Sequence, residues 1–190
     1  MHVMQSLILG IPIAIAAGSP VLVERAPTSA FGLFAYGDGI GGAPLFTTGD
    51  GAFIGTATHS NDSQAAQVEF IANSDNSLVA NPNTTAANDP TWSNLTFSVP
   101  NTTSSSHQVG FSNSTSDDNR SGSGFVFYGD FLLHKETSGD LQSMWYAVPS
   151  GQDNIWTLNW NYTDDDTDGK VLVTLKTTPP SKAVDDASEA

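Results

Sequence analysis

Apolar and polar residues alternate along most of the chain, in short stretches that are separated by turn-forming residues. In residues 155–161, for example, Trp156, Leu158 and Trp160 alternate with polar side chains. Alternation with a period of two is typical of β-strands that bury one face. The pattern predicts about eleven strands: Phe31–Tyr36, Pro44–Thr48, Ala52–Thr58, Gln67–Ile71, Leu95–Val99, Gln108–Phe111, Gly124–Tyr128, Phe131–His134, Leu141–Val148, Ile155–Asn161 and Lys170–Lys176.

The strand pattern predicts an all-β domain over residues 31–176. Regular short strands with Gly, Asp and Asn turns are typical of antiparallel architectures. We expect a jelly-roll-like β-sandwich of about ten strands, with a closed β-barrel as the alternative. Residues 73–123 are dominated by Ser, Thr, Asn and Asp and are interpreted as long loops between two or three strands. Residues 62–70 also fit one or two helical turns.

The chain begins with a pattern that is typical of an export signal. Leu7–Ala17 is an apolar run with the length of a signal-peptide core, too short to cross a bilayer, and small residues follow it. We therefore expect a signal peptide over residues 1–18, although the six residues before the run carry no Lys or Arg. A lead at 19–30 and a disordered acidic tail at 177–190 complete the predicted organisation.

Asn-x-Ser/Thr triplets occur more often than chance predicts. The composition gives an expectation of about three such acceptors for N-glycosylation, and the chain has seven. They are Asn61, Asn83, Asn94, Asn101, Asn113, Asn119 and Asn161. With the export signal, this excess predicts a secreted extracellular glycoprotein.

Charge and cysteine content exclude several classes of function. The chain has 20 acidic residues against 6 basic ones, a formal net charge of −14, so a phosphate backbone would be repelled and nucleic acid is not expected as a partner. No membrane partner is expected either. There is no cysteine, which excludes disulfides, thiolate metal sites and cysteine nucleophiles.

An acidic segment between the last two strands resembles half of a calcium loop. Asp164, Asp166 and Asp168 occupy alternate positions and are followed by Gly169. The twelfth position is Leu175 where such a loop has Glu, so the segment is no EF-hand. Two interpretations stay open: a weak extracellular calcium site, and a solvated acidic turn.

Aromatic residues are concentrated in the last strands and suggest a sugar-binding platform. Exposed Trp and Tyr rings on a sheet stack against pyranose rings. Trp156 and Trp160 share the parity of Leu158 and are expected in the core. Trp145 and Tyr146 point to opposite faces, and whichever is exposed is the predicted ligand-binding residue, with core packing as the alternative.

Catalysis has no comparable signal in the sequence. Five carboxylates lie near strand ends or turns, but sequence does not show whether any two face each other at the spacing that glycoside hydrolysis requires. They are Asp38, Asp50, Glu69, Asp130 and Glu136. His59, His107 and His134 are scattered without metal-ligand spacing, and no catalytic residue is assigned.

The segments FGLFAYGDGIGG at 31–42 and GFVFY at 124–128, in a chain rich in glycosylation acceptors and without cysteine, resemble a group of small secreted proteins of filamentous ascomycete fungi. The resemblance implies an extracellular setting, at a cell wall or a host surface, and carries no functional residues. We expect a non-catalytic, effector-like or cell-wall role, with cell-wall polysaccharide or a host extracellular protein as partner. A lectin-like module, assisted by calcium, is the alternative, and a glycoside-active enzyme is the second alternative.

Overall fold

The computed structural model describes residues 26–85, 89–113, 116–117, 119–161 and 163–181. The described residues form fifteen strands and one short 3-10 helix, Ala57–His59. The strands are β1 Phe34–Gly37, β2 Ile40–Thr47, β3 Ala52–Ile54, β4 Ala66–Ala72, β5 Leu78–Pro82, β6 Leu95–Pro100, β7 Gly110–Ser112, β8 Ser116–Asp117, β9 Arg120–Ser121, β10 Phe125–Tyr128, β11 Phe131–Lys135, β12 Leu141–Gln142, β13 Trp145–Pro149, β14 Trp156–Trp160 and β15 Val171–Lys176. The all-β prediction is confirmed.

Six of the strands close into an antiparallel barrel. The order around the barrel is β1, β2, β3, β14, β13 and β15, and β15 pairs with β1 again. The step that joins the two halves of the chain is the pairing of Ile54 with Trp156. Closure leaves these strands without free edges, which is one way in which β-proteins avoid edge-to-edge association. The closed barrel that the sequence left as the alternative is therefore present.

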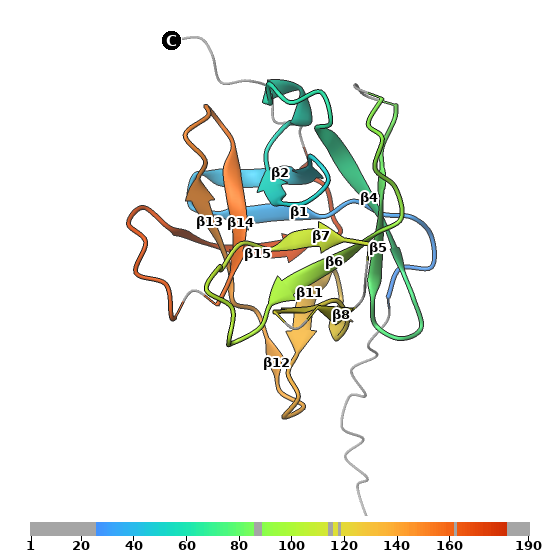
Figure 1. Cartoon of the computed structure of the whole chain (residues 1–190), viewed down its shortest axis with the longest axis vertical. Helices are drawn as coiled ribbons and strands as arrows, with labels where there is room; N and C mark the ends of the chain where they lie inside the picture. Colours follow the sequence, from blue (N-terminus) through green and yellow to red (C-terminus); the bar gives the residue numbers. More distant parts are fainter. Residues whose placement is uncertain (1–25, 86–88, 114–115, 118, 162, 182–190) are drawn as a thin grey trace, which may run out of the picture.

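The other strands extend from two sides of the barrel (Figure 1). On one side β4 pairs with β2 and leads through the long β4–β5 hairpin to β6, β7 and β9. On the other, the β10–β11 hairpin pairs with β15. The larger of two hydrophobic clusters joins both parts, since Phe97 of β6 packs against Trp145 of β13 at 6.2 Å and Phe125 of β10 at 5.1 Å between ring centroids.

Two glycines explain how β1 fits into the barrel. Gly39 has φ of 68°, which suits the tight turn between β1 and β2, because glycine adopts positive φ without steric cost. A Cβ at Gly37 would lie 2.5 Å from the backbone oxygen of Leu172. Only glycine therefore permits the close approach of β1 to β15 at this point.

The structure corrects parts of the sequence interpretation. The strand predicted at Gln67–Ile71 is confirmed as β4, so the helical alternative does not form there, whereas β5, β8 and β9 lie in the segment that was interpreted mainly as loops. Strand β6 is buried on both faces, so Thr96 and Ser98 do not face solvent. Residues 1–25 and 182–190, which hold the predicted signal peptide and most of the predicted tail, lie outside the described residues.

The domain continues beyond Lys176. Thr177 donates a backbone hydrogen bond of 2.9 Å to Asp130, and the Thr178 hydroxyl donates one of 2.7 Å to the Asp130 carboxylate. The described start of the predicted tail is therefore anchored to the β10–β11 turn.

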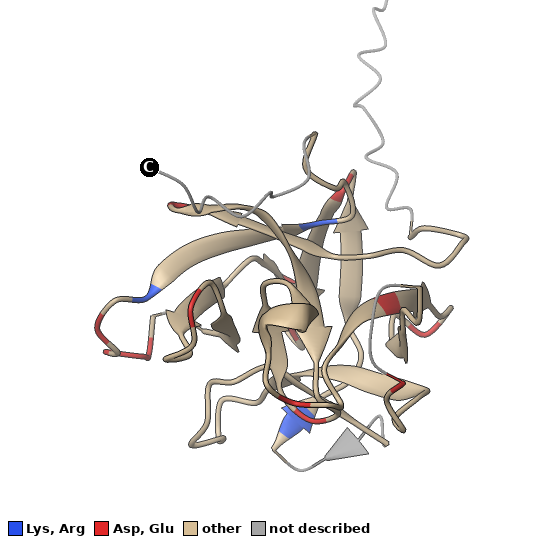
Figure 2. Ribbon diagram, turned by 90° about the horizontal axis from the view of Figure 1, so that it is seen from above, with Lys and Arg blue, Asp and Glu red and all other residues tan. Residues whose placement is uncertain are grey.

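Acidic side chains lie mainly in the loops and turns that join the strands (Figure 2).

Candidate functional site

A groove of about 730 Å³ opens between segments that are distant in the sequence. One wall is the loop that follows β6, another is the β11–β12 hairpin, and the third is the segment that follows β14. More than half of the lining side chains are hydroxyls or amides. The lining residues are Val99, Pro100, Asn101, Thr102, Thr103, Ser104, Ser106, His107, Ser121, His134, Glu136, Thr137, Gln142, Met144, Trp160, Asn161 and Asp164.

The loop wall is held in place by its own hydrogen bonds. Asn101 donates from its backbone to the Asn119 carbonyl at 2.8 Å, which ties the loop to the neighbouring strand region. The Ser104 amide donates to the Asn101 carbonyl at 2.9 Å, and the Ser104 hydroxyl donates to the Ser106 carbonyl at 3.0 Å. Ser and Asn form such local turns readily, so this run of small polar residues shapes the wall.

Trp160 lies beneath the groove and connects it to the core. It lines the groove although only 4% of its surface is exposed, and its ring contacts that of Trp145 at 4.5 Å between centroids. Its backbone amide donates to the His107 carbonyl at 2.9 Å, and Nδ1 of His107 lies 3.2 Å from the Trp160 carbonyl oxygen. The base of the groove is therefore rigid and aromatic.

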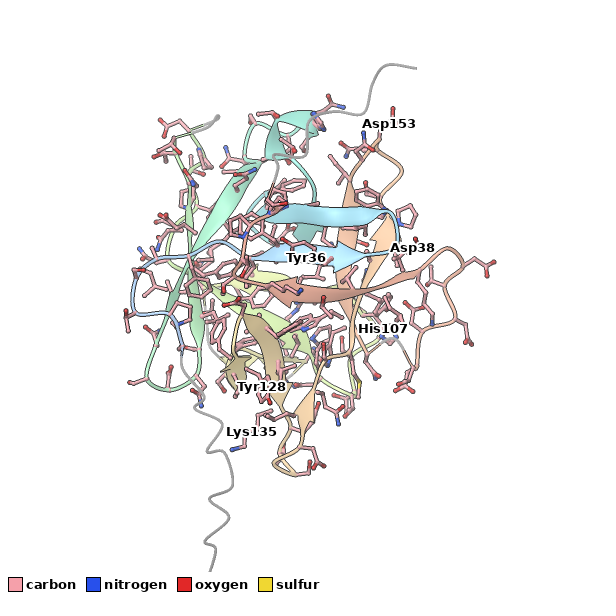
Figure 3. All side chains as sticks on the ribbon, turned by 180° about the vertical axis from the view of Figure 1, so that it is seen from behind. Tyr36, Asp38, His107, Tyr128, Lys135 and Asp153 are labelled. Carbon is pink, nitrogen blue, oxygen red and sulfur yellow. The ribbon has the colours of Figure 1, made fainter. Side chains whose placement is uncertain are left out.

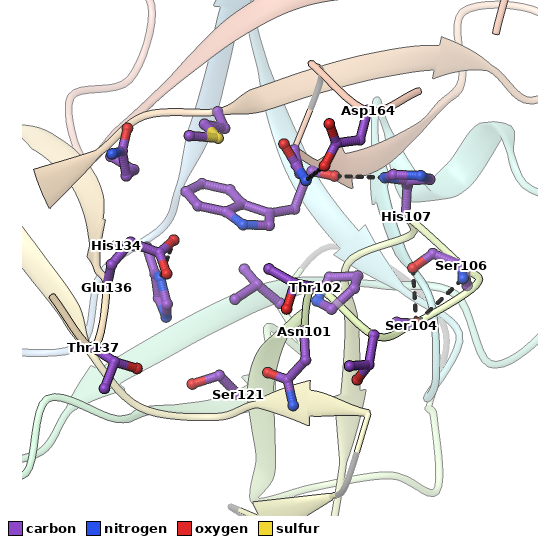
Figure 4. Close-up of a pocket in the computed structure, with 17 residues that line it drawn as sticks. Asn101, Thr102, Ser104, Ser106, His107, Ser121, His134, Glu136, Thr137 and Asp164 are labelled. Carbon is purple, nitrogen blue, oxygen red and sulfur yellow. Dashed lines mark hydrogen bonds and ion pairs between the residues drawn. The ribbon is translucent and has the colours of Figure 1, made fainter. Parts of the chain in front are cut away.

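His134 and Glu136 lie on one side of the groove, and His107 and Asp164 lie on the opposite side (Figure 4). His134 is 6% exposed, and its Nε2 lies 3.0 Å from the Ser123 carbonyl oxygen. Its Nδ1 is buried, has no hydrogen-bond partner and lies 3.9 Å from a Glu136 carboxylate oxygen.

Burial lowers the pKa of His134, and the nearby Glu136 carboxylate and the Ser123 carbonyl offset this only in part. The imidazole is therefore neutral at neutral pH and brings no positive charge to the groove. No pattern in the sequence indicates this arrangement, because His107 and His134 come from segments whose proximity depends on the fold.

Asp165, rather than its neighbours, organises the acidic segment. Its carboxylate accepts hydrogen bonds from the buried Tyr146 hydroxyl and from the amide and hydroxyl of Thr167 at 2.9 and 2.6 Å. Lys170 donates to the Asp165 carbonyl, and its ammonium lies 5.9 Å from the Tyr146 ring centroid. Burial raises the pKa of Asp165, but the hydrogen bonds from Thr167 and Tyr146 outweigh it and lower the pKa to about 2.

The predicted calcium ligands do not converge. Asp164, Asp166 and Asp168 are exposed, and no group of three or more His, Asp or Glu side chains in the described part of the chain is placed to hold a metal ion. Asp164 instead accepts a hydrogen bond of 2.7 Å from the Asn161 amide. Asp165 folds inward at the position between the predicted ligands, as the alternative of an acidic turn allows, and calcium binding by the segment stays a prediction.

Trp145 and Tyr146 do not form a sugar platform, because neither is exposed. Trp145 is 1% exposed and donates its indole N–H to the Leu132 carbonyl at 3.0 Å. Tyr146 is fully buried, and burial together with its bond to Asp165 raises the pKa of its hydroxyl. Alternation along β13 did separate the two rings onto opposite faces, but the fold covers both faces.

Exposed aromatic rings lie elsewhere, on the outer face of β1, β15, β11 and β10. Tyr128 pairs with Phe131, and Phe131 pairs with Lys176, whose ammonium lies 4.6 Å from the Phe131 ring centroid and 5.0 Å from that of Tyr36. Phe131 and Tyr128 are 40% and 46% exposed. We call Tyr36, Lys176, Phe131 and Tyr128 the aromatic row, and Figure 3 labels both of its tyrosines. The sequence Tyr-Gly-Asp occurs at the end of both β1 and β10, and this repeat is the feature of the sequence that could have indicated the exposed rings.

The predicted glycosylation acceptors lie at or near the surface, but two of them line the groove. Asn61, Asn94, Asn113 and Asn119 are exposed, and Asn83, Asn101 and Asn161 are half-buried. Asn101 and Asn161 are groove residues, and Asn161 has φ of 66° and already donates its amide to Asp164. A glycan on either side chain would therefore stand on the groove wall.

Of the five carboxylates noted for acid–base chemistry, Glu136 alone lines the groove, where Asp164 faces it from the other side. Asp38, Asp50, Glu69 and Asp130 are exposed at other positions. His59 is also exposed and lies at a separate shallow depression beside Asn61.

Comparison with protein-family models, with curated proteins and with solved structures found no match. Within the described residues, no helix has the length and apolar character that crossing a membrane would require. Evidence on function therefore comes from the surfaces of this molecule itself.

Proposed function

We propose that the protein is a secreted, non-catalytic carbohydrate-binding protein that acts at a cell wall or cell surface, and that the groove is its ligand site. The observation that carries the proposal is the lining of the groove, in which hydroxyl and amide side chains surround the buried Trp160. Oligosaccharides present hydroxyl groups in many directions, and a site rich in small donors and acceptors satisfies them without charged partners. The volume of about 730 Å³ suits a short oligosaccharide.

The aromatic row favours the same function from a second surface. Tyr128 and Phe131 are exposed and Tyr36 is half-buried, and the Lys176 ammonium lies over the rings of Tyr36 and Phe131. The Lys176 ammonium lies 5.0 Å from the Tyr36 ring centroid and 4.6 Å from that of Phe131, so these rings on β1 and β11 are less than about 10 Å apart. This separation is comparable to the disaccharide repeat of an extended polysaccharide, whose apolar faces stack on aromatic rings.

The first test measures binding of the secreted chain to soluble oligosaccharides and to insoluble chitin, β-glucan and cellulose. We expect Thr137→Ala combined with Gln142→Ala to weaken binding of soluble oligosaccharides about tenfold, because both side chains line the groove. Thr58→Ala combined with Gln152→Ala removes the same two side-chain types at exposed positions outside the groove, and should leave binding unchanged. Equal affinities for the two double variants would refute the groove as the ligand site.

Each protein is measured with its N-glycans present and after their enzymatic removal, because Asn101 and Asn161 lie on the groove wall. Stronger binding after removal would show that these glycans compete with the ligand. If no carbohydrate binds in either form, the proposed function is wrong.

A second candidate function, glycoside hydrolysis, is favoured by one observation. Glu136 and Asp164 line opposite sides of the same groove, as the two carboxylates of a glycoside hydrolase do. Release of reducing sugar, assayed in the same mixtures, separates the two functions. Release that is lost in both Glu136→Gln and Asp164→Asn would establish catalysis and overturn the non-catalytic proposal.

A further inference from the structure

The charges around the groove are all of one sign. Glu136 and Asp164 are its acidic residues, and no Lys or Arg is among the described residues that line it. The whole chain has a net charge of −14, so distant groups add to the negative potential and do not cancel it. A ligand that enters this groove therefore meets carboxylates without a cationic partner inside the site.

His134 is a second, independent observation that points to a ligand beside Glu136, because one of its polar atoms lacks a hydrogen-bond partner. Its side chain is more than nine-tenths buried and lines the groove, yet Nδ1 has no hydrogen-bond partner. A buried polar atom without a partner is costly, and such atoms are often found at functional sites. Because Nε2 lies 3.0 Å from the Ser123 carbonyl oxygen, Nδ1 of the neutral ring is an acceptor, as is the Glu136 carboxylate 3.9 Å away, so a donor supplied by a ligand would pair both.

The groups packed around His134 do not neutralise Glu136. Phe125 of β10 and Trp160 of β14 contact the imidazole ring edge-on, and Gln142 of β12 pairs with His134 across the hairpin. None of these side chains is charged. Lys135, the next residue along β11, is exposed and does not line the groove.

We infer that the groove selects glycans that carry primary ammonium groups, such as oligomers of β-1,4-linked glucosamine, over the neutral and N-acetylated oligomers of the same length. The inference rests on the proposed carbohydrate-binding function and names the ligand class of the same site. The hydroxyl and amide side chains hold the sugar hydroxyls, and Glu136 and Asp164 receive ammonium groups from opposite sides. Charge-assisted hydrogen bonds of this kind are about twice as strong as neutral ones.

The test compares three tetrasaccharides with the same linkage: glucosamine, N-acetylglucosamine and glucose. They differ only in the group at carbon 2, so titration calorimetry in low-salt buffer isolates the contribution of the ammonium. The buffer is kept at a pH at which the sugar amine is protonated. We expect the glucosamine tetramer to bind about tenfold or more tightly than the other two, and the difference to shrink as salt is added.

Charge-removing variants locate the effect. Glu136→Gln and Asp164→Asn keep the shape of each side chain, and each should reduce the preference for glucosamine over glucose about three- to tenfold. Asp153→Asn removes an exposed carboxylate that lies outside the groove and is labelled in Figure 3, and it should leave the preference unchanged. Thermal unfolding of each variant checks that the fold is intact.

The outcomes separate the two proposals. If all three tetramers bind with equal affinity, or if the preference survives in Glu136→Gln and Asp164→Asn, the ammonium inference is overturned while the carbohydrate-binding function stands. If none of the three binds to the unmodified chain, the carbohydrate-binding function is wrong and the inference is wrong with it.

Discussion

Tyr146→Phe is expected to destabilise the protein through a single hydrogen bond. The phenol ring is fully buried, and its hydroxyl donates to the Asp165 carboxylate, which anchors the acidic segment after β14. A hydrogen bond to a charged group contributes about 1.5–3 kcal/mol, and phenylalanine keeps the packing of the ring. Asp165 is only half-buried, so water replaces part of the lost interaction. We expect a loss of about 1–2 kcal/mol in the free energy of unfolding, or about 2–8 °C in Tm.

The matched control is Tyr36→Phe. Tyr36 also donates its hydroxyl to one acceptor, the Thr178 carbonyl at 2.9 Å, but in an exposed setting, so we expect a change below about 0.5 kcal/mol. Urea unfolding followed by tryptophan fluorescence measures both. The hydrogen bonds lower the pKa of Asp165 from 3.8 to about 2, so they contribute stability above pH 3.8 that is lost as the pH falls toward 2. Equal losses in the two variants, or a loss in Tyr146→Phe that is the same at pH 7 and pH 2, would refute this reasoning.

Three further predictions concern the core, pH and calcium. Trp145→Phe removes both volume and the indole bond to Leu132 and should cost about 2–4 kcal/mol in urea unfolding, whereas Trp156→Phe, at a half-buried site, should cost less. Burial lowers the pKa of His134 from 6.5, so the unfolded state binds the proton more readily and stability falls as the pH drops below 6.5. His134→Gln should flatten this dependence, and an unchanged slope would contradict it. Millimolar calcium should not raise Tm, because the predicted ligands do not converge; a rise that Asp166→Asn abolishes would restore the calcium site.

Most strands could be predicted because their signal is local. Residues 171–176 alternate between buried and more exposed positions as the sequence suggests, whereas β14 is found where its alternation predicts a strand but is buried on both faces at 158–160. Strand β5 was missed because Asn81 and Pro82 are uncommon in strands and hide the alternation. Closure of the barrel was left as an alternative because it depends on the pairing of β3 with β14, about one hundred residues apart, and local patterns carry no information on such contacts.

The candidate site could be predicted only in its residue types. Alternation shows which side chains of a strand share a face, but not whether a second layer covers that face, and this is why the sequence left open whether Trp145 or Tyr146 is exposed or packs in the core. The groove requires the loop after β6, the β11–β12 hairpin and the segment after β14 to meet. Their meeting is a property of the fold, so Glu136 and Asp164 could not be paired from the sequence.

The positions of the lysines explain why the groove stays acidic. Lys170 is held over the Tyr146 ring and donates to the Asp165 carbonyl, and Lys176 is held between the rings of the aromatic row. Neither lines the groove. The hydroxyls of a neutral ligand replace only part of the hydration that Glu136 and Asp164 lose, which costs free energy, whereas an ammonium group adds charge-assisted hydrogen bonds. Removal of the two groove carboxylates should therefore weaken binding of a cationic glycan and leave binding of a neutral one equal or stronger. If the two side chains acted only through their shape, both glycans would be affected in the same direction.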